Sequence, residues 1–72
     1  MRATTIAEVR AKADEAREQR TVHAQLCGLI YARKDAVVVA EEAMKVKDYA
    51  TAIEATTLAR DLDNECEDKE PG

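Results

Sequence analysis

Residues that interrupt helices are almost absent from this sequence. It contains one proline, Pro71, and two glycines, Gly28 and Gly72. Because proline and glycine are the strongest breakers of regular structure, residues 2–70 contain such a breaker only at Gly28. The predominant residues, Ala, Glu, Lys, Arg and Gln, are good helix formers, and no stretch shows the sustained apolar–polar alternation of a half-buried strand. The sequence therefore predicts an all-α fold.

The 72 residues hold one domain at most, and its core is thin. Although 46% of the residues are hydrophobic, the only aromatic side chains are Tyr31 and Tyr49, and alanine supplies much of the rest. In so short a chain, the transfer free energy of the buried apolar area barely exceeds the lost chain entropy. We therefore expect a staple or an oligomer, and a helical bundle that is completed by association of copies.

The charge of the chain indicates which partners to exclude. The formal net charge is −4, and it is divided unevenly, with +2 over residues 1–35 and −6 over residues 36–72. An acidic chain gains nothing by approaching phosphates, so we expect no nucleic-acid partner. The first residues lack the apolar segment of a signal peptide, and the longest apolar run, residues 36–40, is too short to cross a bilayer. These features predict a cytoplasmic protein without a membrane partner.

A capping box predicts the start of the first helix. Thr5 and Glu8 have its spacing, and small and aliphatic residues follow at helical intervals. We expect a helical arm over about residues 4–33, either straight or folded back near Thr21. A straight arm has no partner within the chain, which predicts a homodimer or a higher oligomer. The predicted oligomer interface is the stripe on this arm: Ile6, Val9, Ala13, Ala16 and Arg20.

A helical hairpin is expected over about residues 34–66. Asp48 is a good N-cap and places the tip at residues 46–48, while Asp35 is a candidate cap for the first helix of the hairpin. The acidic residues 67–72 are predicted to be a disordered tail, with fraying from about residue 66. The predicted hairpin core follows the largest apolar residues at helical spacing: Leu26, Ile30, Val37, Ala40, Met44, Tyr49, Ile53, Thr56 and Leu62.

Residues 33–64 resemble a single tetratricopeptide repeat. The segment 47–54 is similar to the turn of that family and to the small and aliphatic pair that follows it, and residues 58–64 are similar to its exit. The first helix departs from the family pattern, since Ala36, Val39, Ala40 and Ala43 stand where bulkier residues or glycine are usual. No second repeat follows. The resemblance implies a tightly packed helical hairpin, without a peptide-binding groove.

Few residues are candidates for chemistry. His23 is the only histidine, and neither CxxC spacing nor a glycine-rich phosphate loop is present. We therefore predict no catalytic, cofactor-binding or metal site. Cys27 lies 20 residues before Lys47 and Cys66 lies 19 residues after it, so the two thiols are expected at similar heights of the hairpin, as a possible thiol pair. A cytoplasmic location predicts that they are reduced.

The sequence is most consistent with a non-enzymatic helical interaction module. A small homo-oligomeric regulator, adaptor or inhibitor that binds itself and an unidentified protein agrees with the thin core and the uneven charge. One alternative is a structural or assembly component, or a small chaperone, of a secretion or phage/virion machine. The other is a thiol- or metal-dependent activity built on Cys27, His23 and Cys66.

Overall fold

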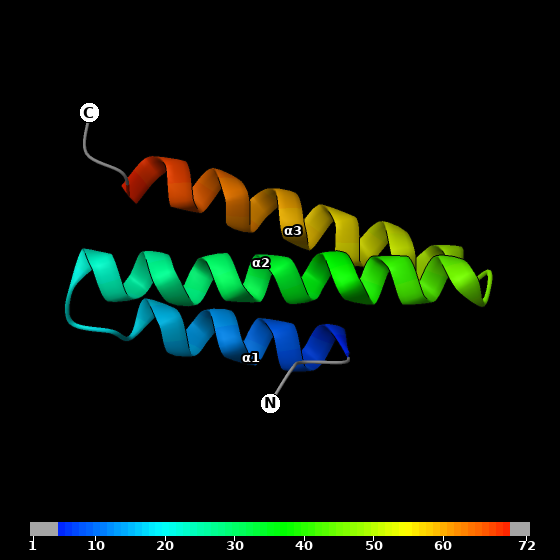
Figure 1. The fold of residues 1–72 in the computed structure, drawn as a ribbon, viewed down its shortest axis with the longest axis horizontal. Coiled ribbons are helices and arrows are strands. Elements are labelled where there is room, and N and C mark those ends of the chain that lie inside the picture. The colour runs from blue at the N-terminus through cyan, green and yellow to red at the C-terminus, as the bar shows by residue number, and fades with distance from the viewer. Residues whose placement is uncertain (1–4, 70–72) are drawn as a thin grey trace.

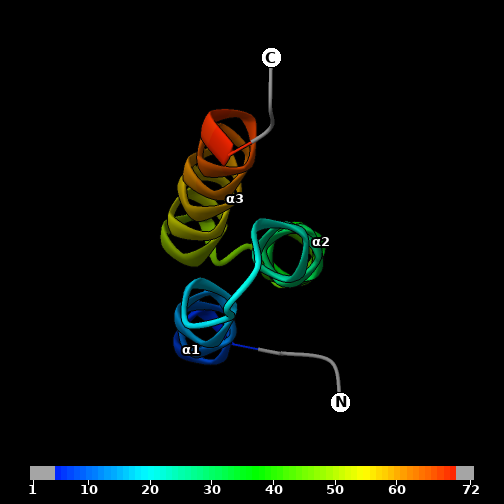
Figure 2. The ribbon, with the colours of Figure 1, turned by 90° about the vertical axis from the view of Figure 1, so that its left-hand side faces the viewer.

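The structure, a computed structural model, describes residues 5–69, which form three helices. Helix α1 spans Ile6–Arg17, α2 spans Val22–Lys45 and α3 spans Tyr49–Lys69. Successive helices run in opposite directions, and the short α1 lies along only part of the α2–α3 hairpin (Figure 1). In the end-on view the three helices form a triangle, with α2 packed against both of its neighbours (Figure 2). The predicted all-α fold is confirmed.

Two threonine caps explain where the first two helices begin. The Thr5 hydroxyl accepts a hydrogen bond from the Glu8 amide at 3.2 Å, and the Thr21 hydroxyl accepts one from the Ala24 amide at 3.1 Å. Between these helices, residues 18–21 form the turn that reverses the chain. The N-terminal segment is therefore not a straight arm over residues 4–33, because it folds back at Thr21, the second of the two forms that the sequence allowed.

The helix after this turn continues through the predicted boundary near residue 34. Asp35 does not cap a helix, since it lies inside α2 and is buried. Its Oδ2 atom instead accepts a hydrogen bond from Lys12 Nζ of α1 at 2.6 Å. The favourable ion pair with α1 outweighs the weak preference of aspartate for a helix start, so the boundary between arm and hairpin at residues 33–34 does not exist.

The tip of the hairpin lies at residues 46–48, as predicted. The Asp48 amide donates to the Ala43 carbonyl at 2.8 Å, and the Lys47 amide donates to the Met44 carbonyl at 3.1 Å. This pair of bonds is a Schellman motif, whose left-handed position is usually glycine. Here Lys47 occupies it with φ of 60°. The Asp48 carboxylate then accepts a hydrogen bond from the Thr51 amide at 3.3 Å, which supports the first turn of α3.

The core follows a different face of the hairpin from the predicted one. Ile30, Val37, Met44, Tyr49 and Ile53 are exposed, and only Leu62 of the predicted core residues is buried. Leu26 and Ala40 are partly buried at the edge of the core, and the exposed Thr56 donates its hydroxyl to the Ala52 carbonyl. The buried apolar residues of the described chain are Val9, Ala13, Ala16, Leu29, Ala32, Ala36, Val39, Ala43, Ala52, Ala55, Leu62 and Cys66.

The predicted core and the observed core differ by a shift of one residue along each helix of the hairpin. Leu29, Ala36 and Ala43 are buried in place of the residues that follow each of them, and on α3 Ala52 and Ala55 are buried in place of their successors. One residue corresponds to about 100° around a helix. The prediction placed the largest apolar side chains inside, whereas the helices pack through their alanines, which allow the backbones to approach closely.

The C-terminal helix extends beyond its predicted end. Residues 67–69, predicted to belong to a disordered tail, are the last residues of α3, while residues 70–72 of that predicted tail lie outside the described residues. Cys66 is only 7% exposed and belongs to the core, and Glu65 is held by Arg17 of α1. These tertiary contacts offset the unfavourable position of acidic residues near a helix C-terminus.

Candidate interaction surface

Eight large apolar side chains on the hairpin are exposed to solvent, and five of them recur at helical spacing on α2 and α3. Ile30, Val37 and Met44 of α2 are 36%, 43% and 54% exposed, and Tyr49 and Ile53 of α3 are 55% and 67% exposed. The α2 residues recur every seven positions, which keeps them on one side of the helix, since seven residues fall only about 20° short of two turns. We call these five residues the apolar face.

The apolar face lies on the opposite side of α2 from α1. Gly28 and Asp35 mark the side of α2 that contacts α1, because Gly28 adjoins Ala16 and Asp35 binds Lys12. Ile30 and Val37 each come two residues later, which is about 200° around the helix. Helix α1 therefore leaves the apolar face uncovered.

Two adjoining hollows run between α2 and α3 along this face. A hollow of about 540 Å³ at the hairpin tip is lined by Met44, Tyr49, Ala52, Ile53, Thr56, Thr57 and Arg60. A second hollow of about 270 Å³ is lined by Val37, Ala40, Glu41, Met44, Thr56 and Ala59. Because Met44 and Thr56 border both hollows, the two form one groove. Such a groove between two helices is a shape into which the side chains of a third helix can pack.

The predicted oligomer interface on the N-terminal helix is wrong. Val9, Ala13 and Ala16 are at most 4% exposed because they pack against the hairpin of the same chain. Ile6 packs at the edge of this core, and Arg20 lies exposed in the turn before α2. The narrow stripe has the character expected of a close helix–helix contact, but the partner is intramolecular once the chain folds back at Thr21.

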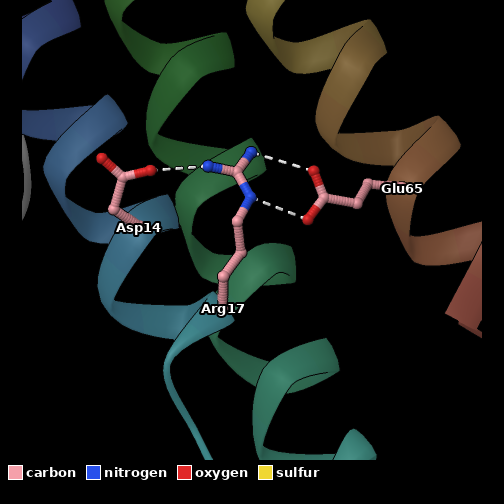
Figure 3. Close-up of polar contacts among 3 residues, drawn as sticks. All are labelled: Asp14, Arg17 and Glu65. Atoms are coloured by element: carbon pink, nitrogen blue, oxygen red, sulfur yellow. Dashed lines mark hydrogen bonds and ion pairs between the residues drawn. The ribbon is translucent and has the colours of Figure 1, made fainter.

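Arg17 links α1 to α3, the two helices that are farthest apart in the sequence. Its Nε atom donates to Glu65 Oε2 at 2.8 Å, its Nη2 atom donates to Glu65 Oε1 at 2.9 Å, and its Nη1 atom donates to Asp14 Oδ1 at 2.7 Å (Figure 3). The hydrogen bonds with Glu65 raise the pKa of Arg17, and those same bonds lower the pKa of Glu65. This bidentate pair holds α3 against α1, where few other contacts link the two helices.

The cysteines lie in different surroundings and do not form a disulfide. Cys27 is exposed, with Sγ 3.7 Å from His23 Nε2, whereas Cys66 is buried in the core. A thiol beside an imidazole is the first requirement of a nucleophilic cysteine, and the two residues are neighbours because they lie four positions apart on α2. Residues 5–69 contain no group of three or more His, Cys, Asp or Glu side chains placed to hold a metal ion, which argues against the alternative in which His23 and both thiols bind one.

Several contacts that fix the surface were missed from the sequence. The Lys12–Asp35 and Arg17–Glu65 pairs join residues far apart in the chain, and no local spacing signals them. Gly28 had a signal, since a glycine within a helix suggests a close approach. Its contact is Ala16, because a Cβ atom at position 28 would lie 2.5 Å from the Ala16 Cβ.

No helix within residues 5–69 combines the length and the apolar character needed to cross a membrane. The tetratricopeptide-repeat resemblance of residues 33–64 stays a prediction. No protein-family model matches this chain, and no curated protein or solved structure is significantly similar to it.

Proposed function

We propose that this chain is a non-enzymatic helical protein–protein interaction module, a small homo-oligomeric regulator, adaptor or inhibitor, and that its apolar face binds a helix of another protein chain. The observation that carries the proposal is that four large exposed apolar side chains, Val37, Met44, Tyr49 and Ile53, line one groove between α2 and α3, with Ile30 one heptad before Val37 on α2. Single exposed apolar residues are ordinary on soluble proteins, whereas a contiguous group marks an interaction surface.

A helix is the partner element that the shape of this surface favours. The groove between α2 and α3 is bordered by apolar residues at helical spacing, and an amphipathic helix fills such a groove with residues at similar intervals. Met44 and Ile53 stand at the two sides of the wider hollow, where they contact an inserted side chain from both helices. The remaining exposed groups of the hollow, Thr56, Thr57 and Arg60, supply a polar rim.

Site-specific photo-crosslinking tests the proposal. A benzophenone side chain replaces Ile53 in the full chain, and a matched variant carries it at Arg10, which is exposed on α1 and distant from the apolar face. After irradiation in extract from the native cells, we expect adducts with another polypeptide at position 53 and little adduct at position 10. Equal yields at the two positions, or no adduct at position 53, would contradict the proposed surface.

A further inference from the structure

We infer that the helix bound by the apolar face belongs to a second copy of this chain, packed antiparallel about Val37. The inference rests on the proposed function and names the partner for that surface. Its basis is the arrangement of α2 on either side of Val37. Ile30 and Met44 each lie seven residues from Val37 on the same side of the helix. A two-fold axis at Val37 therefore brings Ile30 of one copy against Met44 of the second copy.

The charges beside the apolar face have the complementary arrangement. Lys34 and Glu41 are seven residues apart and so occupy one edge of the face. Lys34 lies three residues before Val37 and Glu41 lies four residues after it. In the antiparallel pairing, Lys34 of one copy comes within about 1.5 Å along the axis of the level of Glu41 in the second copy. A parallel pairing instead places Lys34 of the two copies at the same level but on opposite edges of the seam, and Glu41 likewise, so the Lys34–Glu41 pair does not form.

The positions of Lys34 and Glu41 support this pairing. Glu41 borders the groove beside Val37, Ala40 and Met44, so its side chain adjoins the surface that the second copy covers. The Lys34 Nζ atom lies 5.9 Å from the centroid of the Tyr31 ring, which holds the ammonium group near the same helix. Charged pairs that flank an apolar seam set the orientation of paired helices, because the pairs do not form in the wrong orientation.

The proposed dimer leaves α1 on the outside of each copy. Because α1 lies on the opposite side of the hairpin, two hairpins can meet through their apolar faces as a four-helix core. Because α2 ends at Lys45, the two copies of this helix overlap over residues 29–45 when they are centred on Val37, and a two-helix face of that length covers roughly 500 Å² per copy, from 1.5 Å per residue and a width of about 10 Å per helix. The total of roughly 1,000 Å² reaches the lower bound for a biological interface.

Sedimentation equilibrium of the purified full chain tests the inference. We expect a dimer for the wild type at tens of micromolar. The substitutions Lys34→Glu and Glu41→Lys each oppose like charges at both ends of the antiparallel interface, and each should raise the dimer dissociation constant by about tenfold. The double variant restores opposite charges and should return the dissociation constant to within about threefold of the wild type. Both residues are exposed, and the helix content of every variant is checked by circular dichroism.

Three outcomes overturn the inference. The first is a wild-type monomer at tens of micromolar. The second is a dimer that neither single substitution weakens. The third is a double variant whose dimer dissociation constant is as high as those of the single variants. If the purified chain is monomeric while the benzophenone at position 53 captures a different polypeptide, the second copy and the homo-oligomeric part of the proposed function are excluded, and the apolar face stands as a site that binds a helix of another protein. If the purified chain is dimeric but position 53 forms no adduct, the apolar face is excluded as the site of association.

Discussion

The two sides of α2 carry opposite kinds of apolar residue. The side packed against α1 and α3 has Ala32, Ala36 and Ala43 beside the larger Leu29 and Val39, whereas the exposed side has only large residues at the corresponding levels. Hydrophobicity alone therefore does not decide which side is buried. Alanine allows helix backbones to approach closely, and the dispersion attraction across such a close interface compensates for the small area of each side chain.

The contact between Gly28 and Ala16 shows how tightly the inner side is packed. A single added methyl group at Gly28 has no room, since its Cβ would lie 2.5 Å from the Ala16 Cβ. On the outer side of the hairpin, by contrast, hollows of about 540 Å³ and 270 Å³ stand open beside Met44. The inner side is complete within one chain, and the outer side has the shape of a surface that a partner helix can fill.

The largest difference in the free energy of unfolding between the inner and outer sides is expected at two adjacent residues of α2. Leu29 is fully buried, so Leu29→Ala should lower the free energy of unfolding by about 2–5 kcal/mol through lost burial and a residual cavity. Ile30→Ala should cost less than about 1 kcal/mol, because Ile30 is 36% exposed and leaves no enclosed cavity. Urea denaturation at a concentration where the chain is monomeric measures both. Equal losses for the two variants would remove the distinction between inner and outer sides.

A smaller effect is expected at the close contact of α1 and α2. Gly28→Ala gains about 1 kcal/mol of helix propensity but forces the two helices apart, which costs about 1–3 kcal/mol. We expect a net loss of about 1 kcal/mol in the free energy of unfolding. The double variant Gly28→Ala with Ala16→Gly moves the gap to the other helix and should recover most of that loss. A gain of about 1 kcal/mol from Gly28→Ala alone would show that the helices are not in contact there.

The pair of Arg17 and Glu65 tests how α3 is held to α1. Glu65→Gln should lower the free energy of unfolding by about 0.5–1 kcal/mol at neutral pH, a small value because both side chains are partly exposed and solvent screens the pair. The folded-state pKa of Glu65 lies below its ordinary 4.5. Its stabilisation is therefore present above pH 4.5 and is lost as the pH falls through the folded-state pKa.

Denaturation curves of the wild type and Glu65→Gln across this pH range provide the measurement. The two stabilities should converge on acidification below the folded-state pKa of Glu65. Glu67→Gln is the matched control, since Glu67 is exposed on the same helix two residues further on. A difference between wild type and Glu65→Gln that is independent of pH would argue against the ion pair as its cause.

The smallest effect on the free energy of unfolding is expected at the hairpin tip, which lies between α2 and α3. Lys47 adopts a left-handed conformation that costs a residue with a side chain about 1 kcal/mol more than glycine. Lys47→Gly should therefore raise the free energy of unfolding by about 0.5 kcal/mol, after the greater entropy of glycine in the unfolded chain is subtracted. Thermal denaturation detects this as a small rise in the midpoint. A fall would mean that the Lys47 side chain makes a contact that outweighs the strain.

Local signals in the sequence were sufficient for the helices and for one turn. Thr5 and Asp48 each cap a helix through the side chain that the sequence suggested, and Thr21 caps α2 at the place where the chain was expected to fold back. These caps are predictable because the donor and the acceptor lie within three residues of each other. Asp35 has the same capping chemistry, but Lys12 from another helix binds it, and no local pattern distinguishes the two situations.

The interaction surface was predictable only in part. The sequence grouped Ile30, Val37, Met44, Tyr49 and Ile53 within one hairpin core, and the structure leaves all five exposed, four of them around the groove between α2 and α3. The sequence placed this group in the core, because helical periodicity specifies which residues share a side but not which side a neighbouring helix covers. Val9, Ala13 and Ala16 were in turn assigned to a second chain, because their own partner lay beyond a turn at residues 18–21.

The sequence by itself determined the all-α class, the caps and the grouping of residues on each helix, since these depend on propensities and hydrogen bonds within a few residues. The tertiary structure decided which side of each helix is buried. Once α1 folds back, its small residues fit only against the alanine side of α2, with Gly28 beside Ala16, and the larger residues are left facing solvent. Close packing depends on the shapes of two surfaces at once, and a single helix carries the information for only one of them.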